Sequence, residues 1–157
     1  MIIAFSICSN NYLAQAKTLL DSLVIHHPEI KTVIFLVDEL QENIDYNFFN
    51  PAKVIVVDEK IVTAYKKLVQ RYSILELNSA VRPFLFQYLA MQYPLANRLY
   101  YLDPDIYVYD RLDYLDKLLE TEDILLTPHF LTAIPLDGLT PSENLALNYG
   151  TYNLGFL

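Results

Sequence analysis

The sequence has 157 residues, of which 54% are hydrophobic, 19% are charged and three are glycine, so it is too apolar for a disordered chain and too poor in glycine for a fibre. Eleven basic and nineteen acidic residues give a net charge of −8, which argues against nucleic acid as a partner, because backbone phosphates are bound by basic side chains. With a single cysteine, Cys8, the chain has no disulfide framework, and its length suits one domain over residues 1–157 with one core.

The first residues predict a buried strand at residues 2–7 rather than a targeting segment. They show neither a basic n-region nor a small-residue cleavage site. Apolar runs such as residues 32–37 are far shorter than the ~18 residues of a transmembrane helix, which predicts no membrane-spanning segment. Together with the lone cysteine, these features favour a cytoplasmic protein.

Strand-like and helix-like segments then alternate along the chain. We predict strands at residues 2–7, 32–37, 54–57, 98–102, 124–127 and 152–157, and helical segments at residues 12–26, 61–71, 74–93, 112–119 and 142–147. The long segment 74–93 is expected to break or kink at Arg82–Pro83, because proline disfavours the helical conformation of the residue before it. This alternation is typical of α/β folds with a mostly parallel sheet flanked by helices.

Polar residues follow three of the predicted strands, at Ser9–Tyr12, at Asp38 and at Asp103–Asp105. In parallel α/β sheets, ligands bind at the carboxyl ends of the strands. Asp103 and Asp105 are separated by one proline, and carboxylates of this kind suit Mg²⁺ or Mn²⁺, with other positions left for water and phosphate oxygens. In an acidic chain, such a cation can hold a diphosphate. The alternative is a polar turn in which both carboxylates bind only nearby backbone amides.

The run Tyr101-Leu-Asp-Pro-Asp105 resembles the DxD motif of GT-A-type glycosyltransferases, which move a sugar from a nucleotide diphosphate to an acceptor. Residues 3–12 resemble the first strand and nucleotide loop of these enzymes, Ser79-Ala-Val-Arg82 the helix on the donor side, and Tyr152-Asn153-Leu-Gly155 the Asn-x-Gly strand. Segments 126–129 and 141–143 resemble the bacterial branch of the family-eight-like transferases. The resemblance covers nearly the whole chain, and it implies a Rossmann-like GT-A nucleotide-diphospho-sugar transferase fold.

The resemblance implies two metal ligands, Asp103 and Asp105, for Mn²⁺ or Mg²⁺, and a catalytic residue, Asn153, at the donor sugar or the acceptor. An amide on a buried strand, as expected for Asn153, needs hydrogen-bond partners. The function implied is metal-dependent transfer of a sugar from a nucleotide-diphosphate donor, with a UDP-sugar favoured, to an unknown acceptor. The donor-binding residues would be Asn11, Tyr12, Asp38, Arg82 and Asp105.

Family-eight-like enzymes also have a second acidic motif and a late histidine that completes the metal site, both downstream of the Asn-x-Gly strand. The resemblance therefore implies that residues 1–157 are the N-terminal, donor-binding part of a catalytic domain whose C-terminal part is absent, which puts turnover by this chain in question. His129 is an alternative ligand, although its Thr-Pro-His turn favours a structural or acceptor-side role. A sheet that lacks strands exposes an edge, through which a homo-oligomer can form.

Other classes of function are weighed against this one. A non-catalytic nucleotide-sugar-binding or assembly module is the main alternative. Phosphoryl chemistry of the haloacid-dehalogenase kind is disfavoured, because its Asp-x-Asp motif follows the first strand. Nucleotidyltransferases, kinases and dinucleotide-binding folds need a glycine-rich loop near the N-terminus, whereas the glycines here are Gly138, Gly150 and Gly155.

Several residues also have purely structural interpretations. Cys8 is expected to be a buried apolar side chain, and Asp38 a turn residue at a strand end. Arg82 is an equal candidate for a surface salt bridge with Glu76 or Asp110. Four tyrosines are expected in the core and the walls of the fold rather than in a stacking platform: Tyr100, Tyr101, Tyr107 and Tyr109.

Overall fold

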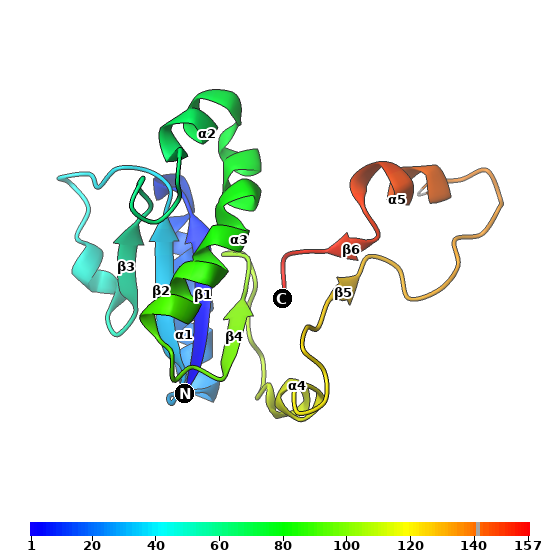
Figure 1. Ribbon diagram of the computed structural model, residues 1–157. Coiled ribbons are helices and arrows are strands. Elements are labelled where there is room, and N and C mark those ends of the chain that lie inside the picture. Colours follow the sequence, from blue (N-terminus) through cyan, green and yellow to red (C-terminus); the bar gives the residue numbers. More distant parts are fainter. Residues whose placement is uncertain (141) are drawn as a thin grey trace. The chain divides into compact units, whose positions relative to one another are not determined.

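The computed structural model describes residues 1–140 and 142–157, and the chain forms two compact units, Met1–Leu112 and Asp113–Leu157 (Figure 1). Pro141, part of the segment 141–143 that resembles the bacterial branch, lies outside the described residues. Within the described part of the chain, no helix is both long and apolar enough to cross a membrane.

The first unit is built on a four-stranded parallel sheet with the strand order β3-β2-β1-β4 (Figure 1). Its strands are β1 (Ile2–Cys8), β2 (Lys31–Leu36), β3 (Lys53–Val56) and β4 (Arg98–Tyr101). β1 and β2 are buried along almost their whole length, as expected for apolar strands covered on both faces. The predicted parallel α/β sheet is confirmed, and each of these strands lies within one residue of its predicted bounds.

α1 (Leu13–His26) connects β1 to β2 and covers one face of the sheet (Figure 1). Its buried side chains lie along one stripe and pack against Cys8 of β1. Cys8 is buried, as predicted. Burial, and to a smaller extent the charge of Asp38, raise the pKa of the thiol to about 12. The thiol therefore stays protonated, which removes it as a nucleophile.

α3 (Ile74–Gln92) leads into β4 and covers the opposite face of the sheet (Figure 1). Phe5 of β1 meets Phe86 of α3 edge to face, with ring centroids 4.8 Å apart. Phe5 and Cys8 lie an odd number of residues apart on one strand, so their side chains point to opposite faces. The two helices thus enclose the sheet between them.

The helix α3 continues through Pro83, so of the break or kink predicted at Arg82–Pro83 the break is wrong and the kink stays a prediction. Pro83 is exposed, so water can solvate the carbonyl that loses its backbone partner. On the other side of the helix, Val81, Leu85 and Leu89 are fully buried. The burial of this face outweighs the local preference of proline, because most helical stability in proteins comes from packing an apolar face.

The helix predicted at residues 61–71 begins later, as α2 (Tyr65–Arg71). Asp58, just after β3, accepts hydrogen bonds from the backbone N–H groups of Lys60 and Ile61 at 2.9 and 3.2 Å. A turn held by the Asp58 side chain replaces the start of the predicted helix, because Asp58 offers the backbone N–H groups an alternative hydrogen-bond acceptor.

The second unit contains two short helices and a small antiparallel sheet: α4 (Asp113–Leu118), α5 (Glu143–Tyr149), β5 (Thr127–Pro128) and β6 (Tyr152–Asn153) (Figure 1). The strands predicted at residues 124–127 and 152–157 are therefore much shorter than expected, and they pair with each other rather than with the main sheet. Apolar side chains beside them, such as Leu126 and Leu154, are 41% and 48% exposed. The burial that would extend a strand is missing at these positions.

Candidate functional site

The strand order of the main sheet reverses between β1 and β4, which pair directly. Phe5 is in register with Tyr101, and the Leu102 N–H donates to the Phe5 carbonyl at 3.1 Å. The loop Ser9–Tyr12 follows β1, and Asp103–Asp105 follows β4. Two of the predicted site segments therefore begin at the carboxyl ends of neighbouring strands. Ligands of open α/β sheets bind at this kind of switch point.

Asp38 ties the loop after β2 to the loop after β1. Its Oδ2 accepts a hydrogen bond from the backbone N–H of Asn10 at 2.6 Å. The Asn10 side chain donates to the Glu39 carbonyl at 2.9 Å and accepts from the Tyr46 hydroxyl at 2.6 Å. The structural interpretation of Asp38 is thus supported, and its role toward a ribose stays a prediction. Sequence reasoning missed Tyr46, whose contact with Asn10 spans 36 residues and leaves no local pattern.

Asn11 and Tyr12 form part of a short 3-10 helix, Asn10–Tyr12, that leads into α1. The Asn11 side-chain oxygen accepts a hydrogen bond from the Ser9 hydroxyl. Tyr12 is 43% exposed, which leaves part of its ring open to contact with a ligand. Aromatic rings with one exposed face can stack on planar groups such as nucleobases. The loop therefore offers the group that the sequence predicted for base contact.

Three side chains near the carboxyl end of β4 form one cluster: Arg82, Tyr101 and Asp103. The Arg82 guanidinium lies over the Tyr101 ring, with its carbon 4.0 Å from the ring centroid. Arg82 Nη2 donates to the Tyr101 hydroxyl at 3.1 Å and lies 3.6 Å from Asp103 Oδ1. Arg82 is only 7% exposed, so the alternative of a surface salt bridge is wrong, and its role toward the donor stays a prediction. The charge of this arginine is held inside the fold, beside a predicted metal ligand.

Tyr101 connects the other two members of the cluster. Its hydroxyl donates to Asp103 Oδ1 while it accepts from Arg82. Burial raises the pKa of Tyr101 most, the negative charge of Asp103 raises it further, and Arg82 opposes both. The phenol therefore stays protonated and remains a donor to the carboxylate.

Asp103 and Asp105 stay the predicted ligands of a magnesium or manganese ion, which would take only part of its coordination from the protein. The Asp103 side chain is 39% exposed, and Asp105 is exposed at the sheet edge. Among residues 1–140 and 142–157, no three His, Cys, Asp or Glu side chains come together to hold a metal. Two carboxylates are nevertheless a usual protein share for Mg²⁺, which keeps several waters and binds phosphate oxygens.

Two residues considered for the site, Asn153 and His129, lie in the second unit and make local hydrogen bonds there. Asn153 is exposed rather than buried, which corrects the expectation of an amide on a buried strand. Its side-chain oxygen accepts the Gly155 N–H at 2.8 Å, as in a local turn. His129 Nδ1 lies 2.9 Å from the Gly150 carbonyl, and the His129 N–H donates to the Thr151 carbonyl at 3.0 Å. These contacts favour the structural interpretation of His129.

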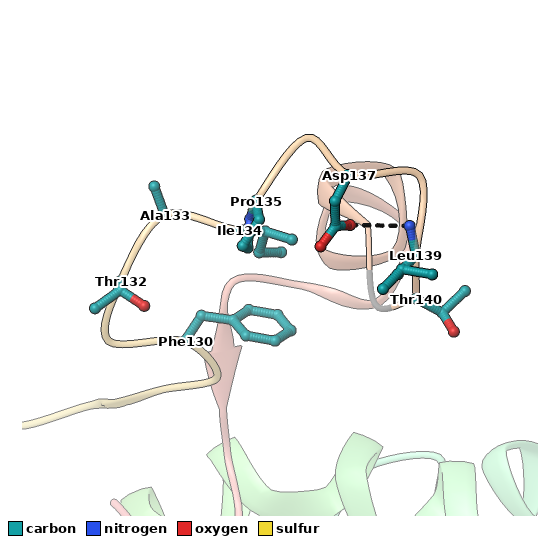
Figure 2. Close-up of a pocket in the computed structure, with 8 residues that line it drawn as sticks. All are labelled: Phe130, Thr132, Ala133, Ile134, Pro135, Asp137, Leu139 and Thr140. Atoms are coloured by element: carbon teal, nitrogen blue, oxygen red, sulfur yellow. Dashed lines mark hydrogen bonds between the residues drawn. The ribbon is translucent and has the colours of Figure 1, made fainter.

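A hollow of about 220 Å³ lies in the second unit, within the loop Phe130–Thr140 (Figure 2). The Phe130 ring faces it, and Asp137 accepts the Leu139 N–H at 2.9 Å in a local turn. None of the predicted site residues lines this hollow. Its walls are mostly apolar, whereas the edge of the main sheet gathers carboxylates, an arginine and a tyrosine.

No protein-family model matches the sequence, and no curated protein matches it. The chain is similar to crystal structures of LgtC. One is an active-site mutant, at 20% sequence identity and a TM-score of 0.51. Another is the galactosyltransferase in complex with donor and acceptor sugar analogs, at 19% identity and a TM-score of 0.52. Both alignments cover 99% of this chain and 56% of the LgtC chain.

The apo form of the glycosyltransferase GlyE from Streptococcus pneumoniae TIGR4 aligns at 18% identity with a TM-score of 0.45, over 99% of this chain and 32% of GlyE. The likeness to LgtC confirms the Rossmann-like GT-A fold class. The family-eight-like branch within that fold stays a prediction.

Proposed function

We propose that this chain is the donor-binding part of a metal-dependent glycosyltransferase, which takes a nucleotide-diphosphate sugar and transfers the sugar to an acceptor. The observation that carries the proposal is the Asp103–Asp105 pair at the carboxyl end of β4, beside the loop after β1, on a fold shared with LgtC. The LgtC structure in that comparison holds donor and acceptor sugar analogs. The chain spans 56% of LgtC.

Each residue at the edge has a stated task in this proposal. Asp103 and Asp105 hold Mn²⁺ or Mg²⁺, which supplies Lewis-acid neutralisation of the leaving diphosphate. Arg82 donates charge-assisted hydrogen bonds to donor oxygens. Because the chain carries a net charge of −8, these positive charges are what a diphosphate needs for binding here.

The remaining predicted residues orient the donor. Tyr12 stacks on the base, and we favour uracil as that base. Asn11 lies at the base and ribose, and Asp38 accepts hydrogen bonds from the base or a ribose hydroxyl. Asn153 acts at the donor sugar or the acceptor. The hydrogen bond from the Asn10 N–H to Asp38 joins the loop after β1 to the loop after β2, which lowers the cost of ordering these loops on binding.

The proposal predicts that Mn²⁺ and UDP together stabilise the protein, because a ligand that binds only the folded state adds ~2.7 kcal/mol at about 100 times its Kd. Thermal unfolding followed by circular dichroism measures the effect. Asp105→Asn should abolish it, since the amide cannot replace the charged metal ligand. The matched control, Asp110→Asn, removes the same charge nearby and keeps the acceptor for the Arg111 N–H, so its shift should equal that of the parent. Equal shifts in the parent and in Asp105→Asn would contradict the site.

A non-catalytic nucleotide-sugar-binding module is the second candidate. The use of the Asn153 side-chain oxygen in a local turn favours it, because the Gly155 N–H then occupies the oxygen of the predicted catalytic amide. The two candidates differ in turnover. A catalytic chain releases UDP from a UDP-sugar in the presence of Mn²⁺, whereas a binding module shows the same thermal shift without release.

A further inference from the structure

The hydroxyl of Tyr101 stands between two charged groups that the proposed function assigns to different partners. In the proposed function, Arg82 binds oxygens of the donor and Asp103 binds the cation. The Tyr101 hydroxyl accepts from Arg82 Nη2 at 3.1 Å and donates to Asp103 Oδ1. One hydroxyl has one donor and two acceptor positions, so it can serve both at once.

The strand geometry explains why this residue reaches Asp103. The Leu102 N–H still pairs with the Phe5 carbonyl, so the chain remains extended beyond the end of β4. Residues two apart on an extended chain point to the same side. Tyr101 and Asp103 therefore share a side, and the phenol lies along the carboxylate.

The ring of Tyr101 is held firmly. Tyr101 is 1% exposed, its ring centroid lies 5.3 Å from that of Phe5, and the Arg82 guanidinium covers a face of the ring. A fixed ring gives a fixed hydroxyl. The contacts from Tyr101 and Arg82 both go to Oδ1 of Asp103, which leaves Oδ2 as the oxygen that a cation can take.

We propose that Tyr101 is a positioning residue of the cation site: its hydroxyl holds Asp103 by Oδ1, turns Oδ2 toward the cation and keeps Arg82 beside it. This inference rests on the proposed function. Hydrogen-bond partners of metal ligands orient those ligands, and their loss typically lowers metal affinity by about 10–100-fold.

The first test measures binding of Mn²⁺ alone to the full chain, from the loss of the electron paramagnetic resonance signal of free Mn²⁺. Tyr101→Phe keeps the buried ring and removes only the hydroxyl, and we expect its Kd for Mn²⁺ to rise by about 10-fold or more. Tyr65→Phe is the matched control, because Tyr65 is also buried near this edge and its hydroxyl donates to the Val37 carbonyl at 2.6 Å. Its Kd should stay within about twofold of the parent value.

A second measurement keeps the hydroxyl in place and does not depend on how well Tyr101→Phe folds. A 3-fluorotyrosine introduced at position 101 reports its surroundings by fluorine resonance. Titration with diamagnetic Mg²⁺ should shift this resonance in the parent and leave it unmoved in Asp105→Asn. A resonance that stays unmoved while the parent is saturated with Mg²⁺ overturns the inference.

The outcomes separate the inference from the function beneath it. If the parent binds Mn²⁺ no better than Asp105→Asn does, the proposed cation site fails and the role of Tyr101 fails with it. If the parent binds Mn²⁺ through Asp105 and Tyr101→Phe binds it as tightly, only the inference about Tyr101 is wrong.

Discussion

His27 shows how one buried side chain joins distant parts of the first unit. It is 2% exposed, its Nε2 accepts the Leu112 N–H at 2.7 Å, and its Nδ1 lies 3.0 Å from Glu29 Oε1. An accepting Nε2 requires a neutral ring with its proton on Nδ1, which then donates to Glu29. The contact fixes the end of the segment that follows Asp103–Asp105 onto the end of α1.

We expect His27→Ala to lower the free energy of unfolding by about 1–3 kcal/mol, because the Leu112 N–H loses its acceptor in a partly buried position. Urea denaturation followed by circular dichroism measures the loss. His26→Ala is the control, since its ring is less buried and its contact with Arg111 uses the backbone carbonyl, which the substitution keeps. Equal losses in the two variants would show that the imidazole contact adds nothing.

For single residues, the sequence predicted the chemical role of a side chain better than the residues that it contacts. The end of α1 at His26 follows from local pattern, and so does the Asp-Pro-Asp turn after β4. The partner of His27 lies 85 residues away, and Arg82 and Tyr101 lie 19 residues apart. Such pairs come together only through sheet order, so local reasoning left a surface position for Arg82 open as an equal alternative. Of the four tyrosines expected in the core and the walls, Tyr107 and Tyr109 are 44% and 82% exposed and so lie outside the core.

Among the elements, α3 has the clearest local start signal. Ser73 caps the helix through a capping box: its hydroxyl accepts the Glu76 N–H at 3.4 Å, and Glu76 Oε2 accepts the Ser73 N–H at 2.8 Å. The hydrogen bonds from the Ser73 backbone and hydroxyl hold the pKa of Glu76 below its ordinary value of 4.5. The pattern Ser-x-x-Glu is a sequence signature of such a start.

The lowered pKa of Glu76 predicts in which direction pH changes the free energy of unfolding. A carboxylate with a lowered folded-state pKa adds stability above its ordinary pKa of 4.5, and this stability is lost as the pH falls through the folded value. Glu76→Gln keeps a capping side chain that does not titrate. The unfolding free energy of this variant, measured in urea between about pH 5 and pH 3, should fall less steeply than that of the parent. Parallel curves would rule out a contribution from Glu76.

Strands were predictable where a core lies beneath them. In the main sheet, β1 and β2 are apolar runs buried between α1 and α3, and β3 and β4 beside them are partly buried, so the apolar pattern reports the strands. β5 and β6 come from equally apolar sequence, yet they are short. An apolar run indicates a strand only where other apolar side chains pack against it.

On the scale of the whole molecule, the apolar core is unevenly distributed. Within the described part of the chain, the buried apolar side chains all lie between Ile3 and Val108, inside the first unit. The sequence predicted one domain over residues 1–157 and a possible homo-oligomer through an exposed sheet edge, and both stay predictions. In the main sheet, β3 and β4 are the edge strands available for such pairing.

The distribution of the core predicts how the two units behave when separated. A fragment of residues 1–112 contains the whole sheet, its covering helices and the contact between His27 and Leu112, so it should unfold cooperatively in urea. A fragment of residues 113–157 has no described apolar side chain that is buried, and should lack a cooperative transition by circular dichroism, because the burial of its described side chains does not offset its conformational entropy. Because Asp103, Asp105, Arg82 and Tyr101 all lie in the first fragment, it should also bind Mn²⁺ as the full chain does. A first fragment that is unfolded, or that unfolds without cooperativity, would mean that residues 113–157 contribute packing on which the sheet depends.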